Sequence, residues 1–221
     1  MGDASAVQFG PQPLPCAVNA ARALRYLGQR RAGLPEHLER RLREAADQCA
    51  RTARPRGVGR VYPLRWGGSG QPVQLAGTGV ALLGADIARF LEGCTHVVVL
   101  AVTLGMESEQ QLARAQALSP LEGLLADGCA SSMAEEAARA ASEEIERRAR
   151  AAGFQPTKRF SAGYGDLPLQ LQPDMLRLSG GDKLLGIHMG PSLLMTPMKS
   201  VTAVVGLKPL YRPDARDTER R

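Results

Sequence analysis

Residues 96–105, with the sequence HVVVLAVTLG, predict a buried β-strand. The stretch is rich in β-branched residues and lacks the alternation of polar and apolar side chains that marks a half-exposed strand. A strand of this kind needs apolar material on both of its faces. We therefore expect a sheet that is covered by helices.

Helical patterns occur on both sides of this strand along the chain. Apolar residues recur at helical spacing in residues 16–32 and 35–52, and Pro35 suits the first position of the second helix. The same reasoning predicts further helices at residues 84–93, 107–118 and 121–152 and near 173–178.

Shorter strands are predicted at residues 60–66, 72–77, 183–190 and 200–207. Strands and helices do not alternate strictly, so the fold class is α+β: one domain with a mixed, mostly antiparallel twisted sheet flanked by helices. We expect a helical N-terminal extension at residues 1–57, the main region at 58–210 and a polar tail at 211–221.

Composition narrows the classes of function. The 221 residues carry a net charge of +6, with 28 Lys and Arg against 22 Asp and Glu. Aromatic residues make up only 4% and no nucleic-acid-binding module is visible, so we expect no nucleic-acid partner. No apolar run approaches the roughly 20 residues of a membrane-spanning helix, and no secretory signal is visible. A cytoplasmic protein without membrane contact is expected.

No metal site or catalytic group is predicted. The cysteines Cys16, Cys49, Cys94 and Cys129 are widely separated, whereas zinc and redox sites use closely spaced ligands. GxGxxG, P-loop, HExxH and GxSxG signatures are absent from the sequence. We interpret the cysteines as small buried residues.

Two segments near the C-terminus carry more information. Residues 159–168, RFSAGYGDLP, place glycines on both sides of Tyr164, which permits positive φ and close approach of the backbone to a ligand. Arg159 in this segment is suited to bidentate binding of a carboxylate. The second segment is residues 195–201, MTPMKSV, which leads into a β-branched strand.

Together these segments resemble the activation (reactivation) domain of cobalamin-dependent methionine synthase. That family carries R-x-x-x-G-Y-x-x-C-P and, further on, T-E-S-x-x-M-x-P-x-x-S-V-S-G. The chain matches these patterns at Arg159, Gly163, Tyr164, Pro168, Ser192, Met195, Pro197, Ser200 and Val201. The resemblance covers residues 58–207.

The chain departs from the family pattern at three places. Leu167 replaces the cysteine of the loop, and residues 202–203, Thr-Ala, replace Ser-Gly. Residues 190–192, Gly-Pro-Ser, stand where the family has Thr-Glu-Ser, so a carboxylate is lost there.

The resemblance implies a protein that binds S-adenosylmethionine (AdoMet) and supports the reductive methylation of an oxidised cobalamin, with the chemistry supplied by the cofactors. The chain has no D-x-H-x-x-G segment, which supplies the cobalt-ligating histidine in cobalamin-binding domains. We therefore expect the corrinoid on a partner: a corrinoid-binding protein, or a methionine synthase that lacks its own activation domain. A reducing protein of the flavodoxin or ferredoxin type is a further expected partner.

Two alternatives stay open at this stage. One is a degenerate copy that keeps the fold and acts as a non-catalytic scaffold for a corrinoid protein, which the lost glutamate at Pro191 favours. The other is an unrelated enzyme with a small-molecule pocket.

The resemblance also assigns ligand-binding residues. Arg159 would bind the methionyl carboxylate, and the ring of Tyr164 would lie against the adenosine or the sulfonium. Gly163 and Gly165 would let the backbone approach the adenosine. Asp166 would bind the amino group, or is an ordinary turn residue.

Three further residues follow from the same resemblance. Asp127 and Glu135 lie eight residues apart on the long predicted helix and therefore near one face of it. They would face the cobalamin-binding domain of the partner, or form a solvated helix face. Tyr211 stands near the position of an adenosine-contacting tyrosine.

Overall fold

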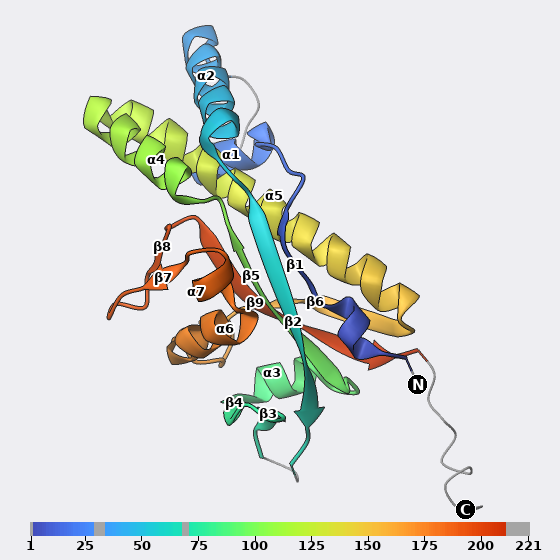
Figure 1. The fold of residues 1–221 in the computed structure, drawn as a ribbon. Coiled ribbons are helices and arrows are strands. Elements are labelled where there is room, and N and C mark those ends of the chain that lie inside the picture. Colours follow the sequence, from blue (N-terminus) through green and yellow to red (C-terminus); the bar gives the residue numbers. More distant parts are fainter. Residues whose placement is uncertain (1, 29–33, 68–70, 211–221) are drawn as a thin grey trace, which may run out of the picture.

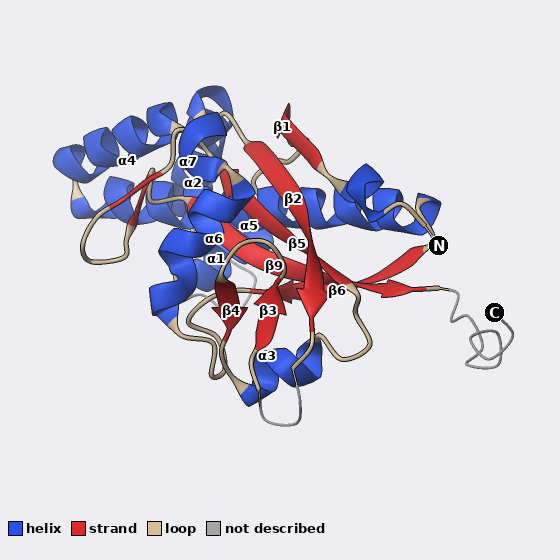
Figure 2. Ribbon diagram, turned by 60° about the horizontal axis from the view of Figure 1, so that its bottom comes forward, coloured by secondary structure: helices blue, strands red, loops and turns tan. Residues whose placement is uncertain are grey.

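The computed structural model describes residues 2–28, 34–67 and 71–210, which form an antiparallel sheet between layers of helices (Figures 1 and 2). The helices are α1 (Ala20–Tyr26), α2 (Glu36–Thr52), α3 (Ala85–Phe90), α4 (Met106–Leu118), α5 (Pro120–Ala151), α6 (Gln172–Ser179) and α7 (Gly181–Leu184), with 3-10 turns at Ala4–Val7 and Leu169–Leu171. The strands are β1 (Phe9–Pro13), β2 (Arg56–Arg65), β3 (Val73–Leu75), β4 (Val80–Leu82), β5 (His96–Thr103), β6 (Phe154–Phe160), β7 (His188–Met189), β8 (Met195–Thr196) and β9 (Ser200–Pro209).

Strands β2, β5 and β9 form the centre of the sheet. The order is β4-β3-β2-β5-β9-β6, with β1 paired to β2, and β7 and β8 form a separate hairpin. Every pair among the described residues is antiparallel, which confirms the predicted α+β class and makes the sheet more uniform than the mixed sheet expected. Strand β5 confirms the buried strand predicted at residues 96–105.

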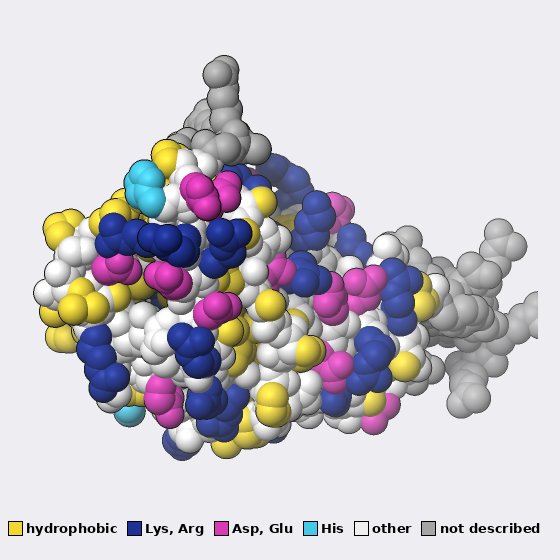
Figure 3. Space-filling model, turned by 90° about the horizontal axis from the view of Figure 1, so that it is seen from above, with side chains coloured by type: hydrophobic (Ala, Val, Ile, Leu, Met, Phe, Trp, Pro, Cys, Tyr) yellow, Lys and Arg dark blue, Asp and Glu magenta, His cyan; other side chains and the backbone are white. Residues whose placement is uncertain are grey.

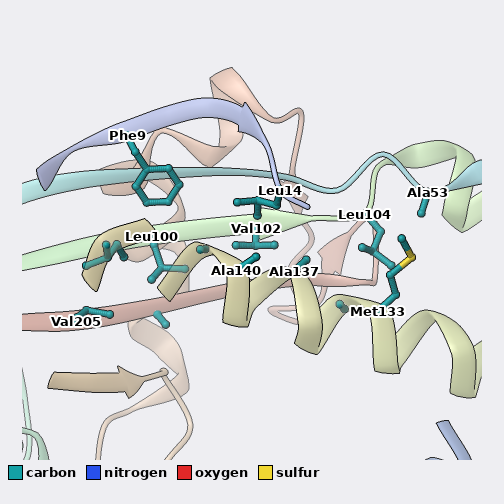
Figure 4. Packing of buried hydrophobic residues seen from close by; sticks show 14 of the residues in the cluster. Phe9, Leu14, Ala53, Leu100, Val102, Leu104, Met133, Ala137, Ala140 and Val205 are labelled. Atoms are coloured by element: carbon teal, nitrogen blue, oxygen red, sulfur yellow. The ribbon is translucent and has the colours of Figure 1, made fainter. Parts of the chain in front are cut away.

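The two faces of β5 contact different layers, which explains its lack of polar alternation. Leu100 and Val102 pack against the alanine-rich face of α5 (Figure 4), and Val98 belongs to the same cluster. Val97 and Val99 lie in a second cluster on the opposite face, together with side chains of α3 and α6. Because successive side chains of a strand point to opposite faces, a strand buried on both faces is apolar throughout.

Helices α1 and α2 both pack against α5. The start of α1 is held there by Ser132, whose hydroxyl accepts from the Asn19 amide at 3.0 Å and donates to the Asn19 carbonyl at 2.9 Å. Gly128 of α5 allows the close approach, since a Cβ there would lie 3.1 Å from the Leu27 side chain and 3.3 Å from the Ala23 carbonyl oxygen. The helical segment before the main region therefore covers the outer side of α5.

Several predicted elements differ from the structure. The strand predicted at residues 183–190 is wrong over most of its length: α7 takes its first residues, Gly186 has a φ of +69°, and only β7 is extended. Strands β1, β4 and β6 were not predicted, because glycine and proline within or beside them weaken the pattern. Helix α1 is shorter than residues 16–32, of which 29–32 lie outside the described residues.

The predicted division of the chain is not tested as a domain boundary and stays a prediction. The structure adds that the segment 1–57 contributes β1 to the sheet as well as helices. The predicted tail at 211–221 lies outside the described residues.

The surface over the upper end of the molecule carries mixed charge. Figure 3 shows basic side chains interspersed with acidic ones on this face.

In the described ranges, no helix combines the length and apolar character needed to cross a membrane. Among the described residues, no group of three or more His, Cys, Asp or Glu side chains is placed so that it could hold a metal ion.

Candidate functional site

A cleft of about 560 Å³ lies where the ends of several elements meet. Its volume falls in the range of small-molecule sites. The lining comes from α5, the end of β6, the following loop, the start of α6, the β7–β8 hairpin and the start of β9: Glu135, Arg159, Phe160, Ser161, Tyr164, Gly165, Gln172, Met195, Ser200, Val201 and Thr202. Both informative segments of the sequence therefore contribute to one cavity.

Arg159 and Glu135 form an ion pair in the cleft. Nη2 of Arg159 donates to Oε2 of Glu135 at 3.2 Å. Strand β6 carries Arg159 next to Val205 of β9, just after the β6–β9 register shifts. Such irregularities re-aim the side chains that follow them. The chain turns back after α5, so β6 brings Arg159 beside Glu135, which precedes it by 24 residues.

The loop after β6 is closed by its own backbone. The Gly163 amide donates to the Leu167 carbonyl at 2.9 Å, and the Leu167 amide donates to the Tyr164 carbonyl at 3.1 Å. Gly163 has a φ of +85° and Gly165 a φ of +53°, so both adopt the left-handed conformations expected of them. Leu167 is buried and anchors the loop in the core, whereas Tyr164 is 70% exposed.

Asp166 points away from this loop toward α3. Its carboxylate accepts from the Ala85 amide at 2.5 Å and from the Asp86 amide at 3.1 Å, which satisfies free N–H groups at the helix start. Gly84 makes room for it, because a Cβ there would lie 2.2 Å from an Asp166 carboxylate oxygen. Asp166 is absent from the described lining of the cleft and acts as a structural cap.

The start of β9 is tied to α4 and α5. Lys199 Nζ donates to Asp127 at 2.8 Å and to the Ser131 hydroxyl at 2.9 Å. Glu109 accepts from the Met198 amide at 2.7 Å. Asp127 therefore has a structural partner, and its spacing of eight residues from Glu135 puts the two near one face of α5.

Tyr26 at the end of α1 is an exposed aromatic residue that does not belong to the described lining of the cleft. Partial burial raises the pKa of the Tyr26 hydroxyl, the charge of Glu135 raises it further, and the charges of Arg22 and Arg25 oppose this rise. The cleft residues that were not predicted as site residues include Phe160, Ser161, Gln172 and Thr202.

The structure brings together only part of the predicted set. Arg159, Tyr164, Gly165 and Glu135 line the cleft, and Gly163 shapes its loop. Tyr211 lies outside the described residues. The ligand and partner roles of these residues are not tested by their placement and remain predictions.

Comparison with solved structures identifies the architecture. The described fold matches a crystal structure of the MetH reactivation domain bound to AdoHcy, with a TM-score of 0.60 over 96% of this chain and 85% of that chain. The chain shares the fold of the MetH reactivation domain. This confirms the resemblance predicted from the two sequence segments.

The similarity to the MetH reactivation domain lies in the fold, since the sequences are 16% identical. No family model matches the chain, and no curated protein matches it.

Proposed function

We propose that this protein binds AdoMet in the Arg159 cleft and supports reductive methylation of a corrinoid on a separate protein. The observation that carries the proposal is that Arg159 and Tyr164, both from the R-x-x-x-G-Y segment, line one cavity. This cavity occurs in a fold shared with a MetH reactivation domain bound to AdoHcy. AdoHcy is the demethylated form of AdoMet, so we expect the cleft of this chain to accept AdoMet as well.

The residues of the cleft fit such a ligand. Arg159 offers guanidinium donors to a carboxylate, and the exposed ring of Tyr164 offers an aromatic face to adenosine or to a sulfonium. Gly163 and Gly165 keep the loop free of side chains near this ring. When bound, AdoMet supplies the methyl group, and the protein holds the donor in place and requires no nucleophile of its own.

We further propose that the corrinoid is carried by a partner protein and reduced by a flavodoxin- or ferredoxin-type protein in the cytoplasm. The net charge of +6 favours association with an acidic partner. Asp127 and Glu135, which pair with Lys199 and Arg159, mark the side of α5 that this partner would approach.

The scaffold alternative rests on the carboxylate lost at residues 190–192. These residues form the exposed turn between β7 and β8, where the Leu193 amide donates to the Gly190 carbonyl at 3.0 Å. They do not belong to the described lining of the cleft. The substitution therefore leaves the cavity lining intact, which favours retained ligand binding over a scaffold role.

A reductive methylation assay tests the proposal. A candidate corrinoid protein in the cobalt(II) state is mixed with AdoMet, a strong one-electron reductant and this protein, and formation of the methyl form is followed by absorbance. We expect methylation to depend on this protein. If AdoMet binds but no cognate corrinoid protein is methylated, the proposed role is wrong.

The variant Gly163→Val tests whether the loop after β6 holds the methyl donor. A β-branched side chain opposes the φ of +85°, and a loop shift of about 1 Å is expected to slow the reaction on the order of a hundredfold. Full activity of a folded Gly163→Val variant would show that this loop does not hold the methyl donor.

A further inference from the structure

The charge of the cleft is balanced by one base and one acid. Among the lining residues described, Arg159 is the single cation and Glu135 the single anion. An α-amino acid group carries the complementary pair, a carboxylate and an ammonium. The cleft is thus suited to a zwitterion and lacks the excess positive charge that a phosphate would favour.

Both partners of this pair have unused bonding capacity. A guanidinium has five N–H donors, and Arg159 uses one of them for a side-chain contact within the described structure. The other carboxylate oxygen of Glu135, Oε1, has no hydrogen-bond partner among the described residues. The side chains of Arg159 and Glu135 are 26% and 35% exposed. A partly exposed pair of this kind stabilises the fold little, so a ligand can replace the contact at small cost.

Nearby acidic residues are already engaged by the protein. Glu136, the next residue on α5, is buried and accepts from Arg139 at 2.8 Å. Asp127 is bound by Lys199, and Asp166 caps α3. Glu135 is therefore the carboxylate that remains available in the cleft for an incoming ammonium group.

We infer that Glu135 binds the α-ammonium group of the ligand whose α-carboxylate the proposed function assigns to Arg159, so that the two side chains together recognise an unblocked α-amino acid. The inference rests on the proposed function and assigns within that site a residue whose predicted role was contact with a partner. Before ligand binding, the Arg159–Glu135 contact keeps the two side chains beside each other in the cleft.

Calorimetric titration with two ligands tests the assignment. AdoHcy carries the α-amino acid group, whereas 5′-methylthioadenosine keeps the adenosine and the thioether but lacks that group. We expect Glu135→Gln, which is nearly isosteric, to weaken AdoHcy binding about tenfold to a hundredfold and to leave methylthioadenosine binding unchanged. The matched control is Glu146→Gln on the same helix, where an exposed Glu146 pairs with Arg150 outside the cleft lining.

Each other outcome overturns a defined part of the reasoning. Unchanged or tighter AdoHcy binding by Glu135→Gln would show that Glu135 only competes for Arg159, and the ammonium assignment would be wrong. Equal affinity of the wild-type protein for both ligands would refute the zwitterion site while nucleoside binding stands. Binding of neither ligand would refute the proposed function together with this assignment.

Discussion

The contact between Gly84 and Asp166 provides a quantitative test of how the candidate loop is held. Gly84 has a φ of +133° and a ψ of 149°. A residue other than glycine adopts this backbone region only at a cost of about 1–3 kcal/mol. In Gly84→Ala, the new Cβ would also lie 2.2 Å from an Asp166 carboxylate oxygen. The carboxylate must then move, and α3 loses its cap, a loss of about 1–2 kcal/mol. We expect Gly84→Ala to destabilise the protein by about 3 kcal/mol in total.

Gly93→Ala is the matched control. Gly93 also has a positive φ, of +77°, but a Cβ there meets nothing closer than the Lys208 side chain at 4.0 Å. This variant measures conformational strain without a clash, at about 1–2 kcal/mol. Asp166→Ala alone should cost about 1–2 kcal/mol, and in the Gly84→Ala background it should cost little more, because the cap is already lost.

Urea unfolding of the four proteins and the double variant measures these differences. Gly84→Ala should also weaken ligand binding, since Asp166 anchors the loop that carries Tyr164. If Gly84→Ala is no more destabilising than Gly93→Ala, or if the Gly84 and Asp166 effects simply add, the anchoring of the loop through α3 is wrong.

Two further predictions follow from ionisable groups. The hydrogen bond from Arg139 lowers the pKa of Glu136 from its ordinary value, so the stabilising contribution of this carboxylate is present at neutral pH and is lost as the pH falls through the lowered pKa. Between neutral and acidic pH, urea unfolding should therefore show a smaller loss of stability for Glu136→Gln than for wild type, and equal losses would refute this prediction. Burial raises the pKa of Cys129 to about 12 and that of Cys16 to about 11, so a thiol reagent at pH 8 should label the native protein slowly, with half-buried Cys16 first. Rapid native labelling of Cys129 would contradict its placement in the core.

The parts of the fold that were predictable are those with a local pattern. Strand β5 could be predicted because burial on both faces leaves an unbroken apolar stretch. Strand β6 could not, since Pro156 and polar residues obscure it and its pairing with β9 shifts register within a few residues. Strand β1 contains Gly10 and two prolines and joins the sheet at an edge, where such residues are tolerated.

The site residues likewise divide into those that a local sequence pattern predicts and those that depend on contacts between distant segments. The glycines around Tyr164 indicate a left-handed loop from sequence alone, and Gly163 and Gly165 adopt it. The partners of Arg159 and Asp166 depend on how α5 and α3 lie against that loop, which no local pattern encodes. Thus the Arg159–Glu135 pair and the Asp166 cap become visible only in the folded chain.

Calorimetric titration with AdoMet tests the central claim most directly. We expect wild-type protein to bind AdoMet, and Arg159→Ala to weaken binding by about 1.5–3 kcal/mol, the range for a hydrogen bond to a charged group. Lys158→Ala, at the exposed neighbouring position, should bind as wild type. Absence of binding heat at millimolar AdoMet, or equal affinities of wild type and a folded Arg159→Ala variant, would contradict the assignment of this cleft as the AdoMet site.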